Sequence, residues 1–394
     1  MTAGSGVASV PVRARFGGFT ASDVATIAGC FVVSRVLLTV IGIVVLNAHT
    51  VPFHNPMQTH PFEPSVPDLY VRWDSFWYVE IARHGYSVLS TWVQPGATAY
   101  AFYPVYPALM WAVSTASGLS VEMSGVVVSN VAFLAALFVI FRLAERWSGD
   151  KAVAGLCVAL LSFAPESFIF SAVYTESLFL LLASGAMLLH ERQQNALAGL
   201  VAAIAAASRS NGVLLVVYFG LTVVRERGLV GALRIWQQPE RYLPIVMTPL
   251  GLFAFWWFAM LTTGDAFAQK STVAHGWHWV TDLPWNNIVR HLTGNLRSSL
   301  LMGLSLAAFA ASLTLLRRDS WPLFVYCLVN FLLFWSGTLP NSLLRYAIVL
   351  FPIFFGLSRM LAHRIVPATL MLLLFVALDA LLMGLWAIGS PFVL

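Results

Sequence analysis

The sequence predicts an all-α protein that crosses a membrane many times. Of its 394 residues, 59% are hydrophobic and only 10% are charged, whereas a soluble domain carries about a quarter charged residues. Apolar stretches of membrane-spanning length recur along the chain, separated by short polar segments. These observations predict a polytopic transmembrane helical bundle of about eleven spans.

The first half of the chain begins with a small, polar segment at 1–22, which we expect to be a cytoplasmic tail preceding one transmembrane domain at 23–394. The first span, 25–46, contains Arg35, which is costly in lipid unless it pairs inside the bundle. A long outer segment follows at 47–123. Its apolar run at 102–119 is interrupted by prolines, so we expect a broken or re-entrant helix there.

Further apolar runs predict the remaining spans, at 124–141, 152–174, 177–189, 196–207, 213–224, 243–262, 298–316, 322–337, 346–357 and 366–388. A second long outer segment, 263–297, is rich in Trp and His. Fourteen of the 22 Lys and Arg residues fall in segments predicted inside and six in segments predicted outside. By the positive-inside rule, this asymmetry sets the orientation.

Residues 72–86 (RWDSFWYVEIARHGY) are charged and aromatic in an otherwise apolar chain. Four apolar residues at helical spacing fall on one side: Trp73, Phe76, Trp77 and Ile81. Asp74 has the position of an N-cap, where a carboxylate can accept N–H bonds of the first turn, and Gly85 can close the last turn. The aromatic content predicts an amphipathic helix lying flat on the outer membrane surface.

Residues 73–86 and 101–107 (AFYPVYP) resemble the PIG-V family of mannosyltransferases. Four further stretches resemble the family in the same order: 171–179, 207–212, 264–269 and 344–352. Members are polytopic enzymes of the GT-C glycosyltransferase class that take mannose from a lipid-phosphate carrier. The resemblance implies a bundle of GT-C type. It also implies that Asp74 is the acidic residue with the catalytic role in the first extracytoplasmic loop.

Transfer from a lipid-phosphate sugar needs a base near the acceptor hydroxyl and cations at the leaving phosphate. We expect Asp74 to be the base and Lys270 and Arg345 to bind the donor phosphate. The alternatives are a solvated loop charge for Lys270 and a contact with lipid headgroups for Arg345.

Other candidates for substrate binding are polar or aromatic and lie in outer or boundary positions: Arg72, Trp73, Tyr78, Glu176, Arg209, His275 and His278. For Glu176 and Arg209 the alternative is a structural ion pair. No carboxylate cluster accompanies His275 and His278, so neither a metal site nor a cofactor is expected. Glu166 and Asp379, each isolated in an apolar run, are expected to be structural.

The predicted function is therefore inverting transfer of mannose from polyprenyl-phosphate-mannose to a lipid-linked, protein or other membrane-proximal acceptor, outside the cell membrane. No nucleic-acid partner is expected, because no long basic cluster is present. A membrane transporter or lipid flippase is the alternative, although no internal repeat is visible; a non-catalytic subunit of a glycosyltransferase complex is another. The Arg-rich, Lys-poor composition favours a bacterial source.

The orientation predicts the labelling of single cysteines introduced into a cysteine-free chain. A cysteine replacing Val280 should react with a membrane-impermeant thiol reagent in intact cells, because the segment 263–297 is predicted outside. A cysteine replacing Leu229 should react only after the membrane is permeabilised. Labelling of position 229 in intact cells would reverse the orientation.

Overall fold

The computed structural model describes residues 18–49, 62–87, 98–338, 340 and 342–393. These residues form helices and connecting turns, with one isolated antiparallel bridge between Thr281 and Gly337. The predicted all-α class is therefore confirmed. Most of the predicted tail at 1–22, and two parts of the predicted outer segment at 47–123, lie outside the described residues.

Five helices of the described part are long and apolar enough to cross a membrane. They are α1 (Ala21–Ala48), α5 (Val121–Ser148), α10 (Leu243–Thr263), α13 (Leu296–Ser312) and α17 (Ile365–Ala387). Shorter helices pack among them: α6 (Lys151–Ser162), α7 (Glu176–Glu191), α8 (Asn195–Ala206), α9 (Leu215–Leu233), α14 (Trp321–Trp335) and α16 (Pro352–Leu361). The span count of eleven remains a prediction.

The sides of the long helices that point away from the bundle are apolar, as contact with lipid requires. Val36 and Val44 of α1 are 57% and 61% exposed, and Leu370 of α17 is 62% exposed. The opposite side of α1 carries Arg35, which is 6% exposed. Its guanidinium donates to the carbonyl of Ser167 at 2.6 Å, so the expected burial inside the bundle is confirmed, with a backbone oxygen among its partners.

Two predicted spans are not continuous helices, because prolines divide them. The segment 152–174 is helical only to Ser162, since Pro165 lacks an N–H and disfavours helix in the preceding residue. The segment 346–357 is split between α15 (Leu343–Ile348) and α16, which has Pro352 as its first residue. Both breaks create turns in the interior of the protein.

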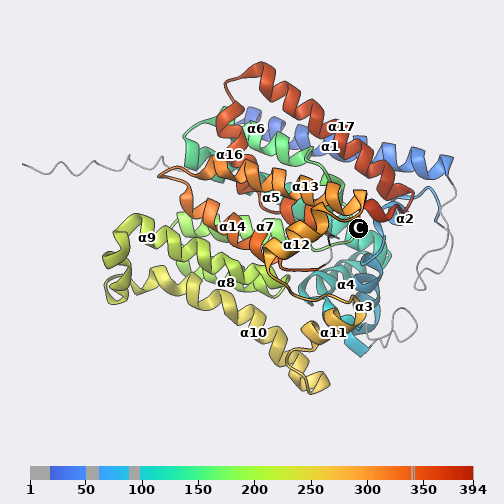
Figure 1. Cartoon of the computed structure of the whole chain (residues 1–394), viewed down its shortest axis with the longest axis horizontal. Coiled ribbons are helices and arrows are strands. Elements are labelled where there is room, and N and C mark those ends of the chain that lie inside the picture. Colours follow the sequence, from blue (N-terminus) through green and yellow to red (C-terminus); the bar gives the residue numbers. More distant parts are fainter. Residues whose placement is uncertain (1–17, 50–61, 88–97, 339, 341, 394) are drawn as a thin grey trace, which may run out of the picture.

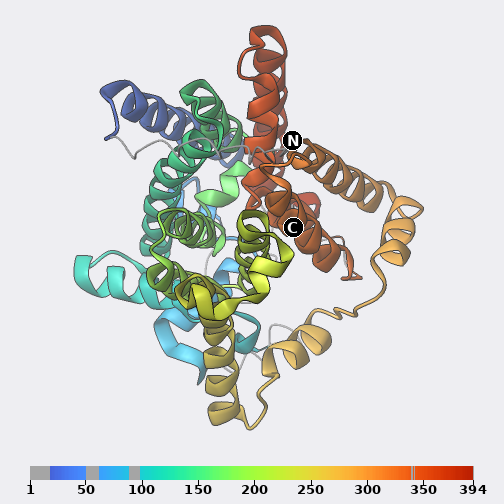
Figure 2. The ribbon, with the colours of Figure 1, turned by 90° about the vertical axis from the view of Figure 1, so that its left-hand side faces the viewer.

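Helices also occupy the two predicted outer segments. The first contains α2 (Val66–Tyr70), α3 (Ser75–His84) and α4 (Val105–Ser117), and the second contains α11 (Ala268–Gly276) and α12 (Pro284–Leu292). In Figure 1 the long helices lie across the view, and α2, α3, α4 and α11 gather at the right-hand end with the C-terminus. Figure 2 shows α11 and α12 following the outside of the molecule from α10 to α13.

Close packing of α8 against α10 predicts the effect of a single methyl group. A Cβ on Gly251 would lie 1.8 Å from the carbonyl oxygen of Ala203, so Gly251→Ala must separate the two helices. We expect a loss of roughly 1–3 kcal/mol of stability, as in overpacked cores, and a lower unfolding temperature in detergent. Gly303→Ala is the control, because a Cβ there meets no atom within 4 Å. Equal unfolding temperatures for Gly251→Ala and the wild type would contradict this packing.

Candidate active site

The turn between α2 and α3 holds Asp74 in a fixed position. Trp73 has a φ of 52°, in a region that large side chains seldom adopt. The Tyr174 hydroxyl closes this turn by accepting a hydrogen bond from the Asp74 N–H at 3.2 Å and donating one to the Arg72 carbonyl at 3.1 Å. Tyr174 lies in the connector before α7, so this segment determines where Asp74 points.

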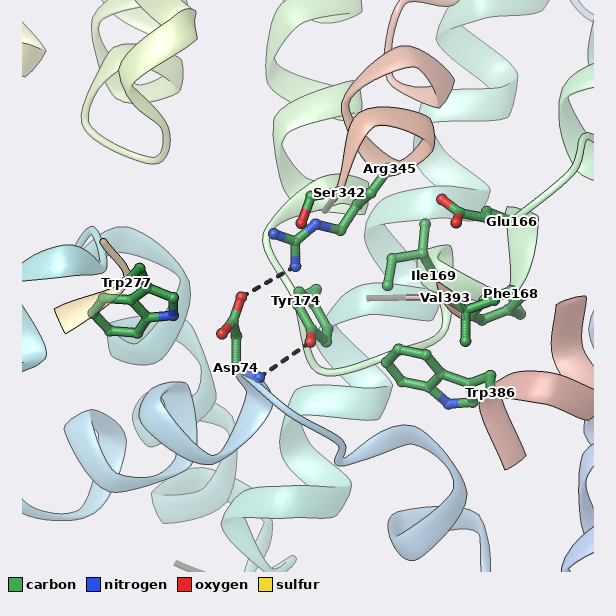
Figure 3. Close-up of a pocket in the computed structure, with 10 residues that line it drawn as sticks. All are labelled: Asp74, Glu166, Phe168, Ile169, Tyr174, Trp277, Ser342, Arg345, Trp386 and Val393. Carbon is green, nitrogen blue, oxygen red and sulfur yellow. Dashed lines mark hydrogen bonds and ion pairs between the residues drawn. The ribbon is translucent and has the colours of Figure 1, made fainter. Parts of the chain in front are cut away.

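The Asp74 side chain does not cap α3, although the residue has the N-cap position. No hydrogen bond joins its carboxylate to the first turn of the helix. Its Oδ2 instead lies 3.3 Å from a terminal nitrogen of Arg345, which Figure 3 shows as a dashed line. The expected capping role is therefore wrong, and an ion pair replaces it.

The helix α3 is packed inside the protein rather than laid against the membrane surface. Trp77 and Ile81, on its expected lipid side, are 4% and 6% exposed. Trp77 stacks on Phe102 with ring centroids 5.6 Å apart. The expectation of a helix lying flat on the bilayer is wrong because other protein segments cover its apolar side. The expected positive φ at Gly85 is confirmed at 69°.

Arg345 is the centre of a chain of alternating charges. Its Nε lies 3.3 Å from Oε1 of Glu176, and the same oxygen lies 2.6 Å from a terminal nitrogen of Arg209. The Arg345 guanidinium also lies over the Tyr174 ring, 4.9 Å from its centroid. Glu176 and Arg209 therefore do form an ion pair, and Glu176 holds Arg345 from the side opposite Asp74.

Burial and charge act in opposite directions on Asp74. Removal from water raises the pKa of its carboxyl, and Glu176 adds to the rise, while Arg345 lowers the pKa by stabilising the carboxylate. The net result is a pKa above the usual value for aspartate. A carboxylate with a raised pKa is a stronger base than a free aspartate, and Arg345 is the neighbour that stabilises its ionised form.

The exposed part of Asp74 faces a cavity of about 1070 Å³. Seven of the residues expected to serve in catalysis or binding line this cavity: Asp74, Tyr78, Glu176, Arg209, Lys270, His275 and Arg345. They come from the α2–α3 turn, α3, α7, the α8–α9 connection, α11 and α15. No acidic partner of Lys270 is found in the part of the chain that the structure describes.

Three residues expected to bind substrate do not line this cavity: Arg72, Trp73 and His278. Arg72 is 2% exposed, and its guanidinium donates to the carbonyls of Asp68 at 2.8 Å and Ala387 at 3.1 Å. These bonds attach the Asp74 turn to the end of α17. Within the described residues, no three His, Cys, Asp or Glu side chains are grouped as metal ligands.

Two residues of the site, Tyr174 and Ser342, were absent from the sequence-based candidates. Tyr174 lies within the stretch 171–179, where the only expected site residue was Glu176. Ser342, which lines the cavity with a φ of 68°, gave no signal in the sequence. A tyrosine in an apolar run looks like core, and its hydroxyl bonds to residues 102 and 100 positions away become visible only in the fold.

A family model described as Mannosyltransferase (PIG-V) matches residues 31–285. The curated protein GPI mannosyltransferase 2 of Yarrowia lipolytica is 28% identical over 194 residues, which are 44% of this chain and 49% of that protein. Its namesake in Cryptococcus neoformans is 31% identical over 160 residues, 38% of this chain and 36% of that protein. The chain thus spans about half, or less, of the length of these relatives.

A solved structure shares the fold. ArnT from Cupriavidus metallidurans, bound to undecaprenyl phosphate, superposes with a TM-score of 0.51 and 14% sequence identity, over 93% of this chain and 77% of that one. At this identity the likeness concerns the fold alone. It agrees with a bundle of GT-C type.

The Asp74–Arg345 pair predicts a change in the pKa of Asp74, measurable from the pH dependence of its labelling by a carbodiimide. Arg345→Met removes the positive neighbour, so the protonated carboxyl is favoured and the labelling midpoint should move to higher pH. Tyr174→Phe should shift it in the same direction, because the freed turn lets Asp74 leave Arg345.

The control for the loss of a buried hydroxyl is Tyr218→Phe, since Tyr218 is 1% exposed and its hydroxyl donates to Glu191 at 3.3 Å, at the opposite end of α7 from Glu176. Its midpoint should equal that of the wild type. A midpoint in Arg345→Met at or below the wild-type value would show that the ion pair is absent in solution.

Proposed function

The chain belongs to the PIG-V mannosyltransferase family, and we propose that it transfers mannose from polyprenyl-phosphate-mannose to a lipid-linked or membrane-proximal acceptor on the extracytoplasmic side of the cell membrane. One observation carries the proposal. Asp74, Arg345 and Lys270, a base and two cations from three separate segments, surround one cavity of about 1070 Å³. Such a group is what transfer from a lipid phosphate requires.

Asp74 acts as the general base. Its carboxylate takes the proton of the acceptor hydroxyl while that oxygen attacks the anomeric carbon of mannose. The bond from the anomeric carbon to the phosphate oxygen breaks, and its electron pair leaves with the lipid phosphate. A single displacement of this kind inverts the anomeric carbon, so a β-linked donor, as the family resemblance implies, gives an α-mannoside.

Arg345 and Lys270 stabilise the leaving phosphate. Arg345 lies between Asp74 and Glu176, so it both keeps the base ionised and presents positive charge next to it. Lys270 lies on α11, a different segment from the one that carries Arg345, and it faces the same cavity. The two cations can therefore contact the phosphate while Asp74 contacts the acceptor.

The remaining cavity wall fits the lipid part of the substrates. Aromatic and aliphatic side chains line it beside the charged groups, including Phe102, Trp256, Phe267 and Leu333. Apolar walls with a few convergent polar groups are typical of ligand sites. Both segments predicted to lie outside, 47–123 and 263–297, contribute to this wall, which supports the extracytoplasmic side.

The purified protein tests the proposal when it is supplied alone with polyprenyl-phosphate-mannose and a membrane lipid extract as acceptor. Asp74→Asn should lower turnover by about 10²- to 10⁴-fold, because it removes the proton acceptor and keeps the shape. Glu80→Gln is the control, since Glu80 lies on the same helix and pairs with Arg83 at 3.5 Å outside the cavity.

Lys270→Met and Arg345→Met should instead raise KM for the donor and also lower kcat, because the phosphate is charged in both the ground and transition states. Arg290→Met, which removes a cation paired with Asp282 outside the cavity, should change neither constant. Full turnover in Asp74→Asn would transfer the role of base to another group, with Glu176 next. Lipid movement without sugar transfer in the wild type would identify a flippase.

A further inference from the structure

A second, smaller cavity of about 90 Å³ lies behind the Asp74–Arg345 pair. It shares Asp74, Trp277, Ser342 and Arg345 with the large cavity, so the ion pair borders both. Figure 3 shows the side chains around it, with Glu166 facing Arg345 across the small cavity. A space of this size excludes a prenyl chain but admits a few hydroxyl groups.

Glu166 is the unexplained residue of this cavity. Its side chain lines the space and is only 5% exposed. No hydrogen bond or ion pair joins its carboxylate to any of the residues that the structure describes. Its oxygens are open to the cavity, so a group that enters the cavity can form hydrogen bonds with them.

The backbone presents Glu166 at some cost. Its φ is 71°, in the left-handed region that residues other than glycine seldom adopt. Such conformations cost about 1–3 kcal/mol and concentrate at binding and catalytic sites. Because α6 ends just before Pro165, the chain turns there and directs the Glu166 carboxylate into the cavity.

The other walls of the small cavity are mainly aromatic. Tyr174, Phe168 and Trp386 line it together with Glu166. Ring faces and edges fit the C–H groups of a saturated ring, while a carboxylate accepts hydrogen bonds from hydroxyls. The small cavity is lined by one cationic side chain, Arg345, and two acidic ones, Asp74 and Glu166. This mixture of charges matches no simple ion, and an uncharged, hydroxyl-bearing ring fits best.

We propose that the small cavity receives one edge of the sugar ring being transferred, and that Glu166 accepts hydrogen bonds from its hydroxyls. This inference rests on the proposed function, because it places the anomeric carbon between Asp74 and the phosphate held by Arg345. Glu166 takes no part in bond making or breaking. It holds the ring and selects uncharged hexoses over sugars that lack the recognised hydroxyl.

Donors that lack one ring hydroxyl at a time test the assignment. With the wild type, loss of the hydroxyl that Glu166 binds should lower kcat/KM by roughly ten- to a hundred-fold. In Glu166→Gly, which suits the positive φ, the same donor should be used as well as the complete donor, because the partner is already gone. Glu166→Gln keeps one acceptor oxygen and should retain part of the discrimination.

The control is Glu191→Gln. Glu191 is also a buried carboxylate, 4% exposed, but it pairs with Arg146 at 3.2 Å and lines neither cavity. This variant should keep the wild-type penalty for each donor. If Glu166 bonds to a donor hydroxyl, the penalty for removing that hydroxyl should disappear in the Glu166 variants. If Glu166 has only a structural role, the penalty should be the same in the wild type and in the variants.

Two failures are distinguishable. If every deoxygenated donor is penalised equally in the wild type and in both Glu166 variants, the subsite assignment is overturned while the transferase function stands. If the wild type transfers no hexose from any polyprenyl-phosphate donor, the proposed function itself is overturned.

Discussion

The site depends on one side chain, Arg345, which is held between two carboxylates. It lies 3.3 Å from an oxygen of Asp74 and 3.3 Å from an oxygen of Glu176. Without the guanidinium, two carboxylates would lie close together in a partly dry interior, where like charges cannot both stay ionised at little cost. Arg345 therefore stabilises the ionised form of Asp74 against the effect of burial, which favours the protonated form.

The connector between α6 and α7 positions both carboxylates that contact Arg345, those of Asp74 and Glu176. The N–H of Val173 donates to the carbonyl of Tyr70 at 3.0 Å, Tyr174 closes the Asp74 turn, and Glu176 begins α7. Pro165 makes this possible, because it ends α6 early and leaves the following residues free to turn through the interior. A break in a helix is tolerated at such depth where it lines a cavity.

Much of the bundle follows from hydropathy, since the long apolar runs become α1, α5, α10, α13 and α17. Asp74, Lys270 and Arg345, the residues chosen from the sequence as base and phosphate ligands, all line one cavity. Other features depend on contacts between distant residues. Asp74 looks like an N-cap because its local sequence favours one, but Arg345, 271 residues away, takes the carboxylate. Glu166 looks structural because nothing nearby in the sequence shows the cavity that it faces.

A structure of the protein with a polyprenyl phosphate bound measures the central claim most directly. The account predicts phosphate oxygens in contact with both Arg345 and Lys270, with the prenyl chain along the apolar wall near Phe102 and Trp256 and with Asp74 still beside Arg345. A phosphate bound away from both cations, with the Asp74–Arg345 pair undisturbed and facing an empty cavity, would contradict it.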